Sequence, residues 1–415
     1  MNIFGTKPTA PEDVFTPRKA VINEEMYMPR PSLETALKQG LRGNVHLVIH
    51  GDSGTGKSWL YKKTFSDLKA TSVVANLANA ARLGSISSEL DVILDEIEPN
   101  RKIGDSQQKD AKVSAAVLEG GISQTNDFEI ARPDPFRAVL KHIRKKAGDG
   151  YGVLVFDNLE AIFSDEKLLR EIASLILLCD DERYAQYRVK ILLVGVPNDV
   201  KNYFYRTDYL TTVASRLTEL PEVDRLTVTA CNELIKKGFT DKLQYKVYSL
   251  EDLQKHVSWV TGRIPLHVHE YCLELAFKCE TSRLVTESDV TEADVVWLSK
   301  NHMNAYSVVE SHMNEKDTKA GRRNQTLFCI SLIDKEQFKS SDVEEVHRRE
   351  FPNSTQGIAL NTSQTLASLT AGDNPIIKRT PKGDAFTFTY PLYRLALRAM
   401  LIKTTDERVE RRSST

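Results

Sequence analysis

A glycine-rich octapeptide carries the clearest chemistry in this sequence. Residues 51–58 read Gly-Asp-Ser-Gly-Thr-Gly-Lys-Ser and match the phosphate-binding pattern G-x-x-x-x-G-K-[ST] at every fixed position. Glycine tolerates the backbone angles that let successive N–H groups point inward at a phosphate. Lys57 would reach the β- and γ-phosphates of a nucleotide, and the Ser58 hydroxyl would bind Mg²⁺. The pattern predicts a nucleotide site whose cofactor-binding residues are Gly51, Asp52, Ser53, Gly54, Thr55, Gly56, Lys57 and Ser58.

The residues on either side of this octapeptide supply the structural context that the motif needs. Residues 45–50 form an apolar run typical of a buried strand, and residues 59–69 have the pattern of a helix. A helix that begins at the loop adds the positive end of its dipole to the phosphate site. The alternative is a glycine-rich turn without a ligand, which the complete motif in this context disfavours.

A second apolar strand would deliver a carboxylate to the same site. Residues 152–157 read Gly-Val-Leu-Val-Phe-Asp, so that a buried strand ends in Asp157. At the carboxyl end of a parallel strand, Asp157 would hold Mg²⁺ directly or through water, together with Ser58. Any apolar strand can end in aspartate, but the preceding phosphate-loop motif favours the metal-binding interpretation.

Two further polar residues are candidates for catalysis. Asn198 follows the predicted strand 189–195 and would reach the γ-phosphate or the attacking water, although an Asn after Pro also forms turns. Arg216 precedes a short predicted strand at 218–221 and could enter the nucleotide site of a neighbouring subunit. The competing interpretation of Arg216 is an ordinary surface arginine.

Composition limits the class of protein. A chain of 415 residues is expected to form two or three domains. The 56 Lys and Arg nearly balance the 57 Asp and Glu, so the chain as a whole is not a polyanion binder. No apolar run is long enough to span a membrane and no signal peptide begins the chain, so we expect a cytoplasmic protein without a membrane partner. The cysteines are scattered without a C-x-x-C pair, and we expect core packing rather than a zinc–cysteine site: Cys179, Cys231, Cys272, Cys279 and Cys329.

The chain order indicates a nucleotide-binding core followed by two smaller regions. The core is predicted over 1–224, with a helical pattern in 18–42 and a polar insertion at 99–132. Arg30 is either a solvated helix start or a residue near the base or ribose. Residues 225–303 have wholly helical periodicity and 304–323 are expected to be a linker.

The last region has the pattern of a winged helix. Residues 324–404 suggest three helices and a β-hairpin, and 405–415 are expected to be a frayed charged tail. The predicted reading helix, 357–369, contains neither Lys nor Arg. Cations that could contact a nucleic-acid backbone lie nearby, at Arg348, Arg349, Lys378, Arg379 and Lys382.

Taken together, these motifs resemble those of the AAA+ ATPases, and more narrowly the origin-recognition and signal-transduction (STAND) branches. The segments that carry the resemblance are Phe15–Pro17 with Tyr27–Arg30, Gly51–Ser58, Val153–Glu160, Leu193–Asp199, Ser215–Arg216, Gly262–Pro265 and the winged-helix region. The resemblance implies an α/β fold with a RecA-like P-loop αβα core and a parallel sheet, then a helical lid and a C-terminal winged helix. It also implies ATP at the junction of core and lid, and assembly of protomers through the nucleotide face.

The resemblance assigns roles by motif, with two departures. Asp157 matches the Walker B acid, Asn198 the first sensor and Arg216 the arginine finger. The usual acid after the Walker B aspartate is Asn158 here, and an amide cannot take a proton from water. Either Glu160 takes the proton from water instead, or hydrolysis is slow and the protein mainly holds ATP as a switch. The lid carries Gly-Arg-Ile-Pro instead of Gly-x-Pro, with Arg263 as the candidate sensor.

Two functions follow from these observations. The favoured one is a nucleotide-dependent conformational and oligomerisation switch, of the kind used in bacterial regulation or anti-phage defence, with ATP and Mg²⁺ as cofactors. Its partners would be further copies of the chain or another protein. The alternative is a DNA-binding AAA+ ATPase of the origin-recognition or transposition-regulator type, acting on duplex DNA. The Asn after the Walker B acid and the uncharged reading helix favour the switch.

Overall fold

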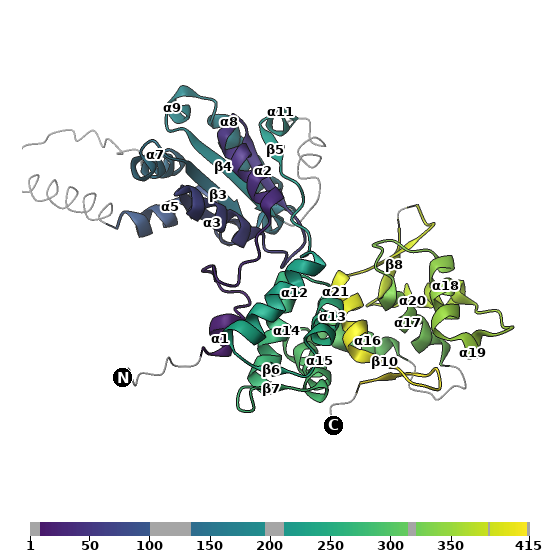
Figure 1. Ribbon diagram of the computed structural model, residues 1–415. Coiled ribbons are helices and arrows are strands. Elements are labelled where there is room, and N and C mark those ends of the chain that lie inside the picture. Colours follow the sequence, from purple (N-terminus) through teal and green to yellow (C-terminus); the bar gives the residue numbers. More distant parts are fainter. Residues whose placement is uncertain (1–8, 100–133, 196–210, 314–320, 381, 413–415) are drawn as a thin grey trace, which may run out of the picture. The chain divides into compact units, whose positions relative to one another are not determined.

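A parallel β-sheet lies at the centre of the unit that contains the phosphate loop. The computed structural model orders its five strands β2-β3-β4-β1-β5, all parallel. The strands are β1 (His46–His50), β2 (Thr71–Asn76), β3 (Gly152–Asp157), β4 (Val189–Gly195) and β5 (Leu217–Glu219). β1 and β3 thus flank β4, and these parallel strands end at the same edge of the sheet, which is where ligands bind in open α/β folds. Figure 1 shows this sheet between its helices, with β3, β4 and β5 labelled.

The structure describes residues 9–99, 134–195, 211–313, 321–380 and 382–412. These residues fall into two compact units. We call Pro29–Asp224 the core unit, and the described part of Met1–Met28 together with that of Arg225–Thr415 the helical unit. Nearly all of the predicted insertion at 99–132, and the candidate Asn198, lie outside the described residues.

Helices cover both faces of the sheet. Leu47 and Ile49 of β1 pack with α2 (Pro31–Arg42) and α3 (Lys57–Leu68) on one face. Val48 lies in the core of the other face, whose helices are α4 (Leu77–Leu83), α5 (Ile86–Ile97), α7 (Pro135–Ala147) and α8 (Glu166–Leu178). Burial on both faces explains why the strands read as continuous apolar runs. The predicted P-loop αβα fold with a parallel sheet is confirmed. The short helices of this unit are η1 (Leu159–Ile162), α9 (Glu182–Ala185) and α11 (Thr211–Ala214).

The N-terminal segment packs in the helical unit, whereas the sequence placed it in the core. Phe15 is fully buried, and its ring lies 5.1 Å from that of Phe239. A Cβ at Gly238 would lie 2.2 Å from the Phe15 ring, so glycine is what lets this ring approach the backbone. The elements here are α1 (Pro11–Val14), α12 (Val228–Lys236), η2 (Lys237–Lys242), β6 (Lys246–Val247), α13 (Leu250–Val260), α14 (Pro265–Lys278), β7 (Leu284–Val285), α15 (Glu287–Asn301) and α16 (Met303–His312).

The C-terminal part contains the elements expected for a winged helix. Four helices, one of them the four-residue α19, precede an antiparallel hairpin in which Ile377 pairs with Phe388. The elements are α17 (Arg322–Leu332), α18 (Ser340–Glu350), α19 (Pro352–Thr355), α20 (Thr362–Leu369), β8 (Ile377–Arg379), β9 (Phe386–Phe388), α21 (Pro391–Met400), β10 (Leu401–Lys403) and β11 (Val409–Arg411). The boundary between the helical lid and the winged helix stays a prediction.

Three segments differ from the sequence-based expectation. The expected linker at 304–323 includes most of α16, whose buried side chains are Ala305, Val308 and Val309. The expected frayed tail pairs as β10 and β11, because Val409 is buried and the Glu407 carboxylate accepts hydrogen bonds from the backbone N–H groups of Asn353 and Ser354. The helical pattern in 18–42 forms a helix only from Pro31 onward.

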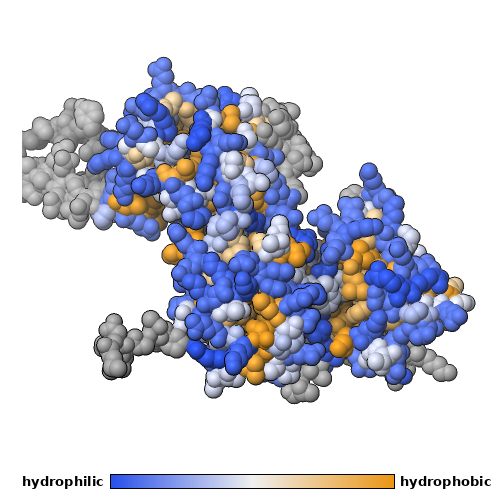
Figure 2. Space-filling model, in the orientation of Figure 1, coloured by the Kyte–Doolittle hydropathy of each residue, from blue (hydrophilic) through white to orange (hydrophobic). Residues whose placement is uncertain are grey.

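Hydrophilic residues cover most of the face seen in Figure 2, with hydrophobic residues in smaller groups between them. Of the helices that the structure describes, none is both long and apolar enough to cross a lipid bilayer.

Candidate functional site

The phosphate loop connects β1 to α3 with a backbone that requires glycine. Gly51 has φ 147°, and a Cβ there would lie 2.3 Å from the carbonyl oxygen of Val223. Gly56 has φ 94° and is the N-cap residue of α3. Both conformations are strained for residues with a side chain. The local sequence therefore builds the phosphate-binding turn that the motif predicts.

The Lys57 side chain folds back onto the phosphate loop. Its Nζ donates hydrogen bonds to the carbonyl oxygens of Gly51 at 2.7 Å and Asp52 at 2.8 Å. Burial lowers the pKa of Lys57, while the carboxylates of Glu160, Asp157 and Asp52 oppose this shift. The ammonium thus sits among carbonyl and carboxylate oxygens at the loop, where a phosphate oxygen could replace the carbonyl partners.

The two residues predicted to bind Mg²⁺, Ser58 and Asp157, are in contact. Asp157 ends β3, and its Oδ2 accepts hydrogen bonds from the Ser58 hydroxyl at 3.3 Å and the Tyr61 hydroxyl at 3.2 Å. A serine hydroxyl beside an aspartate carboxylate is the oxygen donor set that suits Mg²⁺, so these residues fit the ion. Ser58 and Asp157 are 99 positions apart in the chain. The parallel strands, which end at one edge of the sheet, therefore bring these two residues into contact, as expected from the sequence.

Sequence reasoning missed Tyr61. Burial, followed by the charge of Asp157, raises the pKa of Tyr61, so its hydroxyl stays protonated and donates to the carboxylate. The available signal was its spacing, since Tyr61 lies one turn after Ser58 on the same face of α3.

Asn158 follows Asp157, and its side chain is directed toward the end of the neighbouring strand β2. Asn158 has φ 63°, a conformation that Asn tolerates better than most residues. Its Nδ2 donates to Oδ1 of Asn76 at 2.9 Å, and Asn76 is both the last residue of β2 and the N-cap of α4. Asn76 is a second residue that the sequence analysis missed. The amide of Asn158 is thus held by a neighbouring strand.

Glu160 lies near the ends of β3 and β4. It is exposed on η1, and a Cβ built on Gly195 would lie 3.5 Å from its Oε2. Among charged groups, Glu160 has the largest effect on the pKa of Lys57. The structure thus places the carboxylate of Glu160 in the electrostatic environment of the phosphate loop.

Arg216 lies at the opposite edge of the sheet. It immediately precedes β5, and its carbonyl oxygen accepts a 2.8 Å hydrogen bond from the N–H of His46, the first residue of β1. Its Nε lies 2.5 Å from Oδ2 of Asp180. The length of β1, on the order of 15 Å, separates this edge from the phosphate loop. Arg216 therefore cannot contact a nucleotide held by its own loop.

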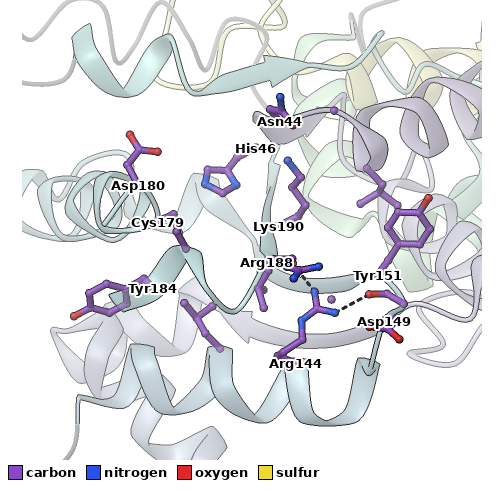
Figure 3. Close-up of a pocket in the computed structure, with 17 residues that line it drawn as sticks. Asn44, His46, Arg144, Asp149, Tyr151, Cys179, Asp180, Tyr184, Arg188 and Lys190 are labelled. Carbon is purple, nitrogen blue, oxygen red and sulfur yellow. Dashed lines mark hydrogen bonds between the residues drawn. The ribbon is translucent and has the colours of Figure 1, made fainter. Parts of the chain in front are cut away.

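A polar cavity of about 480 Å³ opens at this same edge. Figure 3 shows Arg144, whose guanidinium donates to backbone carbonyls including those of Gly150 and Arg188. Burial lowers the pKa of His46 to about 4, so this ring is neutral and its Nδ1 accepts from the N–H of Ile191. Because the cavity is at the edge opposite the phosphate loop, it is separate from the predicted nucleotide site.

Arg30 connects the phosphate loop to the segment after β5. Its guanidinium donates to the carbonyl oxygens of Thr55 at 2.8 Å and Asp224 at 2.6 Å. It is also the N-cap residue of α2. Arg30 therefore starts a helix and positions the loop, while contact with a base or ribose stays a prediction.

Arg263 belongs to the helical unit. Its φ is 60°, and its Nε donates to the carbonyl oxygen of Leu226 at 3.1 Å. Its role as lid sensor stays a prediction, as does the role of Asn198, which lies outside the described residues.

The segment that contains this geometry matches a known family. Residues 41–204 match the family described as "AAA domain", and this range includes the phosphate loop, Asp157 and Glu160. The match lies within the core unit. None of the curated proteins matches the sequence.

Solved structures extend the likeness beyond the matched segment. A Walker-type ATPase of Pyrococcus abyssi has a TM-score of 0.54 at 16% identity, covering 93% of this chain and 99% of that chain. The ORC2 protein of Aeropyrum pernix, in ADPNP–ADP complexes, has a TM-score of 0.50 at 14% identity, covering 92% and 97%. At such identities the likeness concerns the fold. It confirms the predicted resemblance in fold to a Walker-type ATPase and to an ORC2 protein, while the likeness to the STAND branch stays a prediction.

Proposed function

We propose that this chain is an ATP- and Mg²⁺-binding AAA+ ATPase that acts as a conformational and assembly switch. The observation that supports this proposal most strongly is the meeting of Lys57, Ser58 and Asp157 at the carboxyl edge of the parallel sheet. A cation, a hydroxyl and a carboxylate around a loop of backbone N–H groups fit a magnesium–triphosphate.

Each residue has a separate task in binding. The loop amides and the dipole of α3 receive the phosphates, and Lys57 exchanges its carbonyl partners for phosphate oxygens. Ser58 and Asp157 would hold Mg²⁺, which would neutralise negative charge on the phosphates of the nucleotide. Tyr61 orients Asp157 by donating to the oxygen that Ser58 also contacts.

Hydrolysis is proposed to be slow and to depend on Glu160. Water attacks the γ-phosphorus, the bond to the ADP oxygen breaks, and the proton of the water passes to a base. Asn158 cannot accept this proton, and its amide is bound to Asn76. Glu160 is the exposed carboxylate beside the end of β4, where Asn198 would help to orient the water.

Arg216 is proposed to complete the site of a neighbouring protomer. Its place at the sheet edge opposite Lys57 supports action in trans, which would couple hydrolysis to a homo-oligomer. The pair with Asp180 would open on assembly. Such a partly exposed ion pair contributes little stability, so it is easily exchanged for a phosphate.

Replacing Glu160 by glutamine is expected to slow ATP turnover by roughly 10²–10⁴-fold, because the amide removes the general base. ATP affinity should not change, so labelled ATP should stay bound and intact in single-turnover experiments. Glu166→Gln is the matched control, since this exposed acid on α8 pairs only with Arg170 among the contacts described. Turnover of Glu160→Gln at the unmutated rate would remove the role of Glu160.

Binding of duplex DNA is a second candidate function, which the exposed Lys378 and Arg379 of β8 favour. The neighbouring helix α20 supplies no cation. Arg348 on α18 is already bound to Glu344 and to the carbonyl oxygen of Thr355. The small number of available cations supports a protein partner for this region more than a nucleic acid.

A further inference from the structure

Three potential metal ligands meet in the helical unit, and the proposed nucleotide site uses none of them. They are Nδ1 of His267, Oε2 of Glu270 and Nε2 of His302, and all three atoms lie within 4.8 Å of one another. His267 and Glu270 lie one turn apart on α14, while His302 occupies the junction between α15 and α16. Segments distant in the chain thus converge on one point.

Two of the three distances between these atoms match those around a bound ion. His267 Nδ1 lies 3.1 Å from Glu270 Oε2, and His302 Nε2 lies 3.2 Å from the same oxygen. Tetrahedral ligands bonded to Zn²⁺ at about 2.0–2.1 Å are about 3.3 Å from each other. Small side-chain adjustments would therefore place an ion among the three atoms.

His302 Nε2 is buried without a hydrogen-bond partner among the described residues, which independently indicates a ligand. The His302 side chain is 5% exposed, and that of Glu270 is 2% exposed. Although His302 Nε2 is close to the carboxylate, it forms no hydrogen bond with any residue that the structure describes. Buried polar atoms in folded proteins almost always have a partner. A metal ion would use the lone pair of this nitrogen.

The surroundings hold the carboxylate in a ligating orientation. Nε and Nη2 of Arg18 donate to Oε1 of Glu270 at 3.2 and 3.1 Å, while Oε2 faces the two histidines and is hydrogen-bonded to His267 Nδ1. The fully buried Trp297 packs edge-on against His302 with ring centroids 4.9 Å apart. Fixed ligand orientation and an apolar wall are both features of metal sites in proteins.

We propose that His267, Glu270 and His302 form a Zn²⁺ site, with water as the fourth ligand. Two imidazoles and a carboxylate suit Zn²⁺ and related transition ions, whereas Mg²⁺ prefers oxygen ligands only. The ion would join α14 to the α15–α16 junction and, through Arg18, to the N-terminal segment. The proposal does not depend on nucleotide binding, and it differs from the zinc–cysteine site that the sequence disfavours.

Zinc titration of the full chain tests the proposal. Chelator-treated protein in excess Mg²⁺ and without nucleotide should bind one Zn²⁺ in competition with a chromophoric chelator. Tryptophan emission, to which Trp297 contributes beside Trp59 and Trp259, should change with the same stoichiometry. His302→Gln should weaken Zn²⁺ binding by at least roughly 100-fold. His142→Gln should not, because His142 pairs with Glu98 without a second histidine among the described residues.

Two results would overturn the zinc site. One is equal Zn²⁺ affinity of the unmutated chain and His302→Gln, with both folded by circular dichroism. The other is an unmutated chain that binds no Zn²⁺, which would leave an ordinary buried ion network around Glu270. If His302→Gln fails to fold, the absorption spectrum of Co²⁺ added to the unmutated chain is the deciding measurement. Absorption typical of four-coordinate Co²⁺ supports the site, and the spectrum of hydrated Co²⁺ rejects it.

Discussion

Replacing Arg216 by alanine is expected to lower the rate of ATP hydrolysis by roughly 10³-fold or more while ATP affinity stays unchanged. The reason is the position of Arg216 before β5, next to the first residue of β1, at the edge of the sheet opposite the phosphate loop. An arginine there cannot stabilise charge on a nucleotide in its own chain. It can do so only in a neighbouring protomer, so its loss should affect kcat and not binding.

ATP hydrolysis by a mixture of two inactive variants shows whether Arg216 acts on the nucleotide of a neighbouring protomer or has only a structural role. Lys57→Ala protomers would bind no ATP but still present Arg216, whereas Arg216→Ala protomers would hold ATP without the arginine. A mixture should regain measurable hydrolysis. Asp180→Asn is the control, because it removes the ion-pair partner and keeps the arginine. Mixed assemblies that stay as inactive as either variant would exclude an arginine finger at this position.

The second large effect is expected at Lys57. Its replacement by alanine removes charge-assisted hydrogen bonds worth about 3 kcal/mol or more, so ATP affinity should fall by at least roughly 100-fold. Calorimetry with magnesium–ATP measures this directly. Lys63→Ala is the matched control, since Lys63 lies on the same helix and bonds to Asp67. Unchanged affinity in Lys57→Ala would reject the phosphate loop as the nucleotide site.

The sequence predicted the phosphate loop and its metal-binding partner because both follow local rules. Gly51 and Gly56 adopt backbone angles that glycine alone accepts readily, and continuous apolar runs indicate strands buried on both faces. Parallel strands that end at one edge then bring Ser58 and Asp157 together without further information.

Contacts that depend on tertiary packing could not be predicted in the same way. Nothing near Asn158 indicates that its amide binds Asn76, because this contact requires β2 and β3 to be neighbours. The polar segment around α16 becomes helical because a few small apolar residues are buried. The spacing of His267 and Glu270 on one helix is visible in the sequence, but the approach of His302 is a property of the fold.

ATP held by the phosphate loop is expected to change the assembly of the chain. Size-exclusion chromatography with light scattering, with and without a non-hydrolysable ATP analogue and duplex DNA, tests it most directly. We predict a larger molar mass with the analogue alone, and no increase in Lys57→Ala. A mass that does not change at saturating analogue, or that increases only when DNA is present, would contradict the account.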